Sequence, residues 1–114
     1  MIKKIIISGV GGQGVKYLGK KLAEKLIAKG FEVSLILTYD TAIEGGDIFA
    51  QLVYSDKKIK NVLIDKADIL VELGKVKEEF NFEKKIGKEE IKKKFPDKRL
   101  NDGAFEFLVG KLGL

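Results

Sequence analysis

The sequence predicts an α/β fold, a Rossmann-like three-layer domain with a mostly parallel sheet. The first observation is the continuously apolar run Ile5-Ile6-Ile7 in a predicted strand over residues 4–8, which is typical of a strand covered on both faces. The second is a glycine-rich break over residues 9–14. The third is a helical pattern over residues 15–29, followed by a strand over residues 31–37 rich in Val, Leu and Ile. This strand–loop–helix–strand unit has a right-handed crossover where its strands are parallel.

The predicted helix over residues 15–29 carries apolar residues at helical spacing, with Lys16, Lys20 and Glu24 on the opposite side. Gly30 follows, where a glycine commonly ends a helix. We therefore expect this helix to pack on the sheet and the strand over residues 4–8 to be central. The expected buried face of the helix comprises Val15, Leu18, Leu22, Leu26 and Ile27.

The rest of the chain has a less regular pattern. Strands are predicted over residues 48–54 and 68–73, a helix over 88–95 that Pro96 ends, and a last helix over 102–112. Residues 61–65 and 75–87 give no clear indication of either type. The last helix has an expected apolar face of Ala104, Phe105, Leu108, Val109 and Leu112.

Composition excludes several kinds of chemistry. The chain has 114 residues, enough for one domain, and contains no cysteine and no histidine. It therefore lacks the ligands for a cysteine-bound iron–sulfur cluster and the base of a Ser-His-Asp triad. We expect no metal site, no catalytic residue and no membrane span, and a cytoplasmic protein. Abundant Lys and Glu with few amides are typical of proteins from heat-loving organisms, so we expect a thermophile.

The net charge of +5 is concentrated in one segment. Residues 83–99 contain eight basic and four acidic side chains. The segment has no aromatic interleaving and almost no arginine, which base recognition would need. We interpret it as a solvated face and expect no nucleic-acid partner.

The glycine loop is the strongest local motif. Gly9-Val10-Gly11-Gly12-Gln13-Gly14 fits Gly-x-Gly-x-x-Gly, follows a predicted strand and opens a predicted helix. Glycine allows a ligand to approach the backbone, and the helix start favours an anion. Two other interpretations stay open. The glycines could serve packing alone, or a nicotinamide cofactor could bind, although the only acidic candidate, Asp40, lies late for that role.

Four sequence blocks together point to a known family. The first is the glycine loop after an isoleucine-rich strand. The second is Tyr39-Asp40-Thr41-Ala42-Ile43-Glu44-Gly45-Gly46, the third runs from Ala67 to Leu73, and the last is Asn101 with Gly103-Ala104. In this order they resemble the gamma subunit of the 2-oxoacid:ferredoxin oxidoreductases, the family that includes the pyruvate and 2-oxoglutarate enzymes. Its second block reads approximately Tyr-Gly-x-Glu-x-Arg-Gly-Gly, its third forms a strand and its last lies in a late helix.

The resemblance implies a single gamma-type domain over residues 1–114 that works inside a larger complex. Alpha, beta and delta-type subunits would be its partners, with ferredoxin reached through the complex. Thiamine diphosphate and iron–sulfur clusters would belong to the other subunits, and this chain would assist coenzyme A binding and assembly. By itself it would hold no cofactor tightly, catalyse nothing and form a homodimer, with Ile43, Ile48, Phe49 and the last helix as candidate contacts. The expected cofactor-binding residues are Gly9, Gly11, Gly12, Gln13, Gly14, Tyr39, Gly45 and Gly46.

Two departures from the family pattern matter. Asp40, Ala42 and Glu44 differ from the family block, and Glu44 reverses the charge of the family arginine. The chain is also shorter than usual toward its C-terminus. A stand-alone Rossmann-like nucleotide- or coenzyme-binding module is therefore the alternative function.

Overall fold

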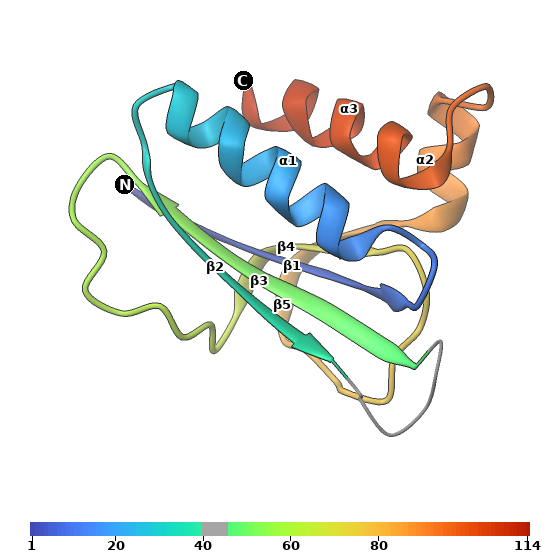
Figure 1. Cartoon of the computed structure of the whole chain (residues 1–114), viewed down its shortest axis with the longest axis horizontal. Helices are drawn as coiled ribbons and strands as arrows, with labels where there is room; N and C mark the ends of the chain where they lie inside the picture. The colour runs from blue at the N-terminus through green and yellow to red at the C-terminus, as the bar shows by residue number, and fades with distance from the viewer. Residues whose placement is uncertain (40–45) are drawn as a thin grey trace.

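The computed structural model describes residues 1–39 and 46–114. The chain alternates strands and helices at first and ends in two helices (Figure 1). The elements are β1 (Ile2–Val10), α1 (Val15–Ala28), β2 (Glu32–Tyr39), β3 (Asp47–Ser55), β4 (Ala67–Glu72), β5 (Phe82–Gly87), α2 (Lys88–Lys94) and α3 (Leu100–Leu112). Among the described residues, no helix is both long and apolar enough to cross a membrane.

The sheet is mixed, with the order β2-β3-β1-β4-β5. β1 pairs in parallel with β4, and β4 with β5. β3 lies antiparallel between β1 and β2, so β2 still runs in the same direction as β1. The predicted α/β class and the central position of the first strand are confirmed. The expected parallel arrangement is confirmed in part. Four of the five strands that the structure describes, all except β3, run in the same direction, but only two of the four strand pairs, β1 with β4 and β4 with β5, are parallel.

The three layers are the helices, the sheet and the connecting segments on the far face. All three helices lie on one side of the sheet (Figure 1). Ile5 and Ile7 of β1 face them in the main core, while Ile6 faces away and packs with Ile64 and Phe80 from the connections. Because β1 is covered on both faces, its isoleucine run is buried throughout, as predicted.

α1 has the predicted amphipathic character with one exception. Leu18, Leu22 and Leu26 are fully buried against the sheet, whereas Ile27 is 60% exposed. The prediction for Ile27 was wrong because the residue directly follows Leu26 and so lies about 100° further round the helix, outside the buried stripe. The helix ends as expected: Gly30 has φ 93° and donates its N–H to the Ile27 carbonyl, while Phe31 donates to Leu26.

The later elements differ more from expectation. β5 occupies a segment without a clear pattern, because only Ile86 of its side chains is buried. α3 begins two residues before the predicted start at Asp102. Ala104 and Leu108 are buried as expected, but Phe107 joins them, and Phe105 is only half-buried.

Candidate functional site

The carboxyl ends of three parallel strands meet at one edge of the sheet. Ser8, Glu72 and Gly87 lie in one row across β1, β4 and β5. The glycine loop follows β1, and Gly74 and α2 follow the other two strands. Ligands of open α/β sheets commonly bind outside this edge. The fold therefore places the glycine loop where a binding site is expected.

Backbone conformation requires glycine at two loop positions. Gly12 has φ 87° and Gly14 has φ 82°, which is the left-handed region. A Cβ added at Gly12 would meet no atom within 4 Å, so this residue leaves open space in front of the loop. At Gly14 a Cβ would collide with the Asn101 side chain of α3. Gly14 therefore serves both conformation and packing, whereas Gly12 serves conformation alone.

Gln13 ties the loop to the sheet. Its Oε1 accepts a hydrogen bond from the Val10 backbone at 2.8 Å, and its Nε2 donates to the Leu73 carbonyl at 2.9 Å. The absence of a side chain at Gly9 and Gly74 provides the space that the Gln13 side chain occupies. A Cβ on Gly9 would lie 2.9 Å from the Gln13 Oε1, and a Cβ on Gly74 would collide with that oxygen. Gln13 thus uses its amide inside the chain, a structural task that the sequence interpretation, which chose it for a ligand contact, did not include.

The loop also presents backbone donors. Gly11 donates to the Gly46 carbonyl at 3.0 Å, and Gln13 donates to Val10. Among the described residues, none accepts a hydrogen bond from the N–H groups of Gly12, Gly14 or the first three residues of α1, whose first turn closes with Leu18 donating to the Gly14 carbonyl at 2.9 Å. That turn contains no acidic residue, and no side chain caps it. These donors and the positive end of α1 favour an anionic group.

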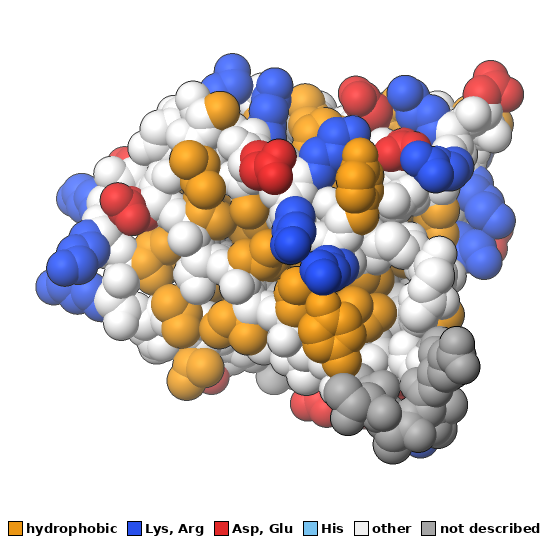
Figure 2. Space-filling view, viewed as in Figure 1, with side chains coloured by type: hydrophobic (Ala, Val, Ile, Leu, Met, Phe, Trp, Pro, Cys, Tyr) orange, Lys and Arg blue, Asp and Glu red, His pale blue; other side chains and the backbone are white. Residues whose placement is uncertain are grey.

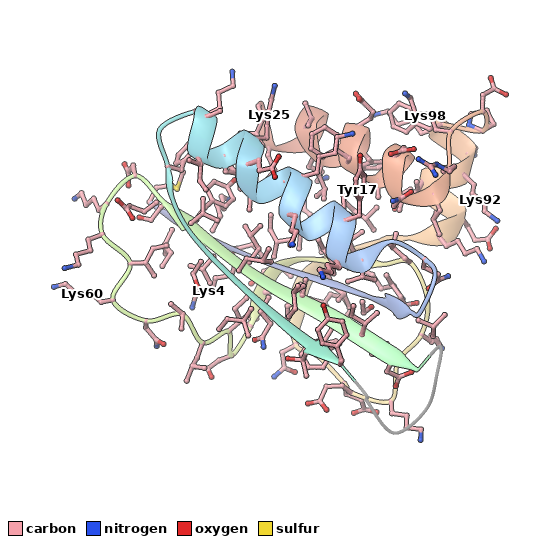
Figure 3. All side chains as sticks on the ribbon, in the orientation of Figure 1. Lys4, Tyr17, Lys25, Lys60, Lys92 and Lys98 are labelled. Atoms are coloured by element: carbon pink, nitrogen blue, oxygen red, sulfur yellow. The ribbon has the colours of Figure 1, made fainter. Side chains whose placement is uncertain are left out.

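A cationic pocket lies beside these donors. It has a volume of about 490 Å³ and is bounded by Gly12–Gly14 on one side and by α2 and the start of α3 on the other. Lys88, Lys92 and Arg99 line it, and Figure 3 shows Lys92 extending from α2. Arg99 is paired with Asp102 at 3.1 Å, and the described residues offer no ion pair to Lys88 or Lys92. We call this space, with its lining residues, the cationic pocket.

Sequence reasoning missed the cationic pocket. It interpreted the whole basic segment over residues 83–99 as a solvated face, and these lysines are indeed exposed. Lys88 and Lys92 stand four residues apart and so share one side of α2. That spacing was the available signal. It could not be used because nothing in the sequence shows that α2 lies next to the glycine loop.

A second pocket lies on the other side of the loop. It measures about 520 Å³ and is mainly apolar, with Val10, Val15, Tyr17 and Ile48 in its lining. Lys16 and Lys20 stand at its border, and Tyr17 is 53% exposed (Figure 3). The glycine loop therefore separates an apolar surface from a cationic one.

The second motif reaches the loop only in part. Gly46 contacts Gly11 directly through the hydrogen bond described above. Tyr39 ends β2 in the same row as Ile48 and Gly9, and its side chain is 48% exposed. Gly45, Asp40, Ala42, Glu44 and Ile43 lie outside the described residues. Ile48 is buried, and the half-buried Phe49 packs edge-on against Phe80 at 5.0 Å.

The comparisons with known proteins bear on this site. The sequence model of the pyruvate ferredoxin/flavodoxin oxidoreductase family matches residues 4–92, most of the chain. The chain belongs to this family. No curated protein matches it.

Among solved structures, two are about a quarter identical to the chain over the segments that align. Subunit PORC of the Thermotoga maritima pyruvate oxidoreductase has 25% identity and a TM-score of 0.53, covering 64% of this chain and 38% of that one. The 2-oxoglutarate:ferredoxin oxidoreductase of Magnetococcus marinus, with 2-oxoglutarate, coenzyme A and succinyl-CoA bound, has 26% identity and a TM-score of 0.60, covering 65% and 13%. The chain therefore spans well under half the length of either relative.

A third structure supports the fold. The gamma subunit of the keto/oxoacid ferredoxin oxidoreductase of Geobacter sulfurreducens has 18% identity and a TM-score of 0.62, covering 96% of this chain and 75% of that one. The fold shared with this structure thus covers 96% of the chain, further than the family match, which ends at residue 92 before α3.

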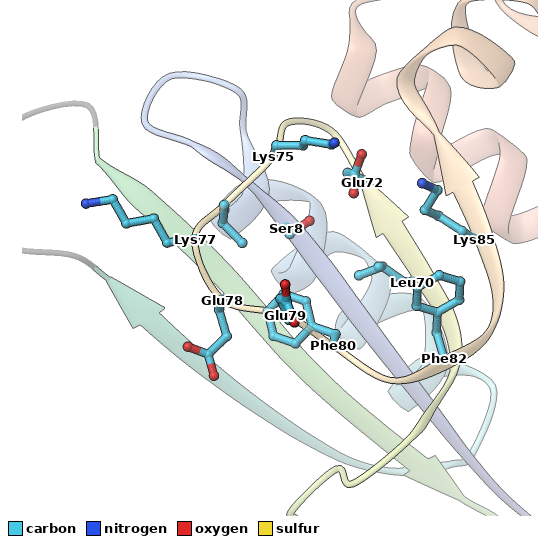
Figure 4. A pocket seen from close by; sticks show the side chains of 11 residues that line it. Ser8, Leu70, Glu72, Lys75, Lys77, Glu78, Glu79, Phe80, Phe82 and Lys85 are labelled. Carbon is cyan, nitrogen blue, oxygen red and sulfur yellow. The ribbon is translucent and has the colours of Figure 1, made fainter.

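Another cavity of this family member lies on the far face of the sheet (Figure 4). It measures about 400 Å³ and lies between the connection over residues 75–80 and strands β4 and β5. Its lining mixes both charges, including Glu72, Lys75 and Lys85. The buried Ser8 points into it, and its hydroxyl donates to the Gly74 carbonyl at 3.4 Å. This mixture has no preference for an anion.

Among residues 1–39 and 46–114, the side chains with displaced pKa values lie away from the loop. Burial raises the pKa of Tyr54, and the nearby Asp68 adds to the effect. A hydrogen bond from the N-terminal amine lowers the pKa of Asp56, and one from Lys66 lowers that of Glu83. Tyr54 and Asp56 belong to the opposite end of the sheet from the glycine loop. The anion preference of the loop therefore comes from backbone donors and permanent cations.

Proposed function

We propose that the chain is the gamma-type component of a 2-oxoacid:ferredoxin oxidoreductase and that it helps this complex to bind coenzyme A. The observation that carries the proposal is the position of Lys88, Lys92 and Arg99 around the same pocket as glycine-loop N–H groups from which no described residue accepts a hydrogen bond. Coenzyme A carries several phosphate groups, and such donors and cations suit phosphate. The bound coenzyme A in the Magnetococcus marinus relative supports this ligand class.

The proposed division of work follows from the side chains present. Lys88, Lys92, Arg99 and the loop amides would hold anionic groups of the coenzyme, and the apolar surface near Tyr17 would lie beside its uncharged part. The coenzyme itself would supply the thiol that accepts an acyl group. The chain contains no cysteine or histidine, so we assign redox and acyl-transfer steps to the alpha, beta and delta-type partners. We propose no turnover by the isolated chain.

The alternative is a stand-alone coenzyme- or nucleotide-binding module. It is supported by the way Lys88, Lys92 and Arg99 meet the glycine loop in one pocket. The two proposals differ in what the isolated chain does. A module binds coenzyme A tightly alone, whereas a complex component binds it weakly alone and retains partner subunits when purified from its native cell.

The test compares two double variants that remove the same charge. Lys88→Gln with Lys92→Gln removes two cations from the cationic pocket, whereas Lys84→Gln with Lys93→Gln removes two exposed cations elsewhere. We expect the first pair to weaken coenzyme A binding roughly tenfold or more, because two charge-assisted contacts are lost, and the second pair to change it little. Calorimetry on the chain or on its purified complex measures both.

A second matched pair tests the loop. Gly12 and Gly30 both have left-handed backbones, at φ 87° and 93°, and a Cβ at either meets open space. Asparagine tolerates this conformation better than valine, so Gly12→Asn and Gly30→Asn carry similar strain. Only Gly12→Asn should weaken binding. Equal affinities within both matched pairs would refute the coenzyme role of this site.

A further inference from the structure

The two edges of the sheet are protected very differently. β5, at one edge, has six residues and exposes Glu83, Lys84 and Lys85. Charged side chains and short length are the common devices that prevent an edge strand from pairing with another chain. β2, at the other edge, has eight residues with no proline and no lysine, and its only charge is Glu32 at the start. β2 therefore lacks the protection that β5 has.

The backbone of β2 is paired on one side only. Its inner side pairs with β3 from Glu32 to Tyr39, and no other described strand pairs with it. A run of unpaired N–H and C=O groups of this length is a template for another strand. The residues from Val33 to Leu37 are all half-buried, so apolar side chains continue from the core to this edge.

The two faces of β2 carry different side chains. Val33, Leu35 and Leu37 point to the helix side and pack on the main core. Ser34, Ile36 and Thr38 alternate with them and therefore point to the other side. Figure 2 shows hydrophobic side chains in the region of β2 and the start of α1. The edge thus offers an apolar row above the strand and a mixed row below it.

We propose that β2 pairs with β2 of a second copy of this chain, antiparallel about a two-fold axis at Leu35. Such an axis stands perpendicular to the sheet, so residues directly opposite each other point to the same side. Leu35 then faces its own copy, and Val33 faces Leu37, which extends the apolar row across the axis. The two sheets join into one of ten strands, and the helices of both copies lie on the same side.

Charge favours this partner and this register. Two copies of β2 meet without any lysine or arginine, and Glu32 of one copy lies opposite Thr38 of the other. The Thr38 hydroxyl can donate a hydrogen bond to the Glu32 carboxylate, a favourable cross-strand pair. No like charges face each other between residues 32 and 38. The surface is therefore complementary to itself.

The experiment measures the mass of the full chain by sedimentation equilibrium over a wide range of concentration. We expect a dimer of twice the 12.7 kDa chain at high concentration. Hydrogen exchange should show β2 amides more protected as the dimer forms, while those of β5 stay unchanged. A strict monomer, or a dimer in which β2 amides gain no protection, would overturn the proposal.

Two variants test the register through residues that face away from the main core. In the proposed pairing Ser34 lies opposite Ile36. Ser34→Lys with Ile36→Lys places like charges opposite each other and should give a monomer. Ser34→Lys with Ile36→Glu places opposite charges there and should keep the dimer. A mixed-charge variant that is monomeric beside a dimeric wild-type chain would overturn the register centred on Leu35.

A control keeps the added charge away from the edge. Val62→Lys with Leu63→Lys places two cations on exposed apolar residues of another segment, which are 37% and 65% exposed. This variant should remain dimeric. Circular dichroism and thermal unfolding establish that each variant is folded, so a monomeric result for the β2 variant alone locates the contact at that strand. Dissociation of the control as well would contradict the proposal.

Discussion

Gln13 accounts for Gly74 and, together with the Val15 side chain, for Gly9, where an added Cβ would lie 2.7 Å from Val15. The Gln13 side chain bridges the start of the loop and the end of β4, and it lies between Gly9 and Gly74. Glycine at position 74 is needed for space alone, since its backbone is not left-handed. The three residues therefore act as one unit that holds the glycine loop against the sheet.

This unit predicts a non-additive pair of substitutions. Gly74→Ala should destabilise the protein, because the new methyl group displaces the Gln13 amide and breaks its hydrogen bonds. A loss of about 1–3 kcal/mol is expected for buried polar groups left without partners. In a Gln13→Ala background the same Gly74→Ala change should cost almost nothing, since the obstacle is gone. Urea unfolding of the four proteins measures the coupling, and additive effects would refute the unit.

At the scale of elements, α1 separates the residues that carry stability from those that do not. Leu22 is fully buried and Ile27 is 60% exposed, although both are apolar and lie on neighbouring turns. Leu22→Ala should cost about 2–5 kcal/mol, because it removes buried methyl groups and leaves a cavity. Ile27→Ala should change stability by no more than about 0.5 kcal/mol. Thermal unfolding of both variants tests this, and similar losses would contradict the orientation of the helix.

The same helix shows what sequence can and cannot predict. The periodicity of α1 correctly predicted that Leu18, Leu22 and Leu26 are buried, and Gly30 correctly predicted where the helix ends, because both signals are local. Ile27 failed because the width of the buried stripe depends on what packs beside the helix. The strand β5 was not predicted for a related reason. As an edge strand it carries exposed charged residues and has no apolar pattern, so only its pairing with β4 identifies the segment as a strand.

The sequence predicted the backbone part of the candidate site, the glycine loop, but not the side chains that line the cationic pocket. The glycine loop could be placed from its pattern, since glycine spacing reports directly on backbone conformation. The cationic pocket could not, because Lys88, Lys92 and Arg99 come from elements far along the chain. The task of Gln13 was also hidden, because its partner Leu73 is sixty residues away. Long-range contacts of this kind leave no local signal.

For the whole molecule, the direction of β3 is the main departure from a simple parallel arrangement. β3 enters between β1 and β2 and pairs with both in the antiparallel sense. Its pattern over residues 48–54 predicts a strand but carries no information on direction. Because β3 lies between β1 and β2 and not beyond β2, the outer side of β2 is left as the edge of the sheet. This placement leaves the unprotected strand on which the proposed dimer depends.

The C-terminal helix is part of the same folding unit, although the family match ends at residue 92. α3 packs on α1 and α2, and it places Ala104, Phe107 and Leu108 in the main core. Burial of Phe107 and Leu108 alone contributes roughly 3–6 kcal/mol, at about 1.5–3 kcal/mol for each side chain. Whole domains are stable by only about 5–15 kcal/mol. The segment matched by the family should therefore not fold alone.

The test is a chain that ends at residue 94, after α2. Without α3 the part of the main core that it covers beside α1 and α2 is exposed, so we expect no cooperative thermal transition and increased binding of a hydrophobic dye. A synthetic peptide of residues 95–114 should restore the transition, because it supplies the same apolar face in trans. Removing only Gly113 and Leu114 keeps α3 and should leave the transition in place. A shortened chain that unfolds cooperatively without the peptide would show that the core over β1, β3 and α1 is sufficient by itself.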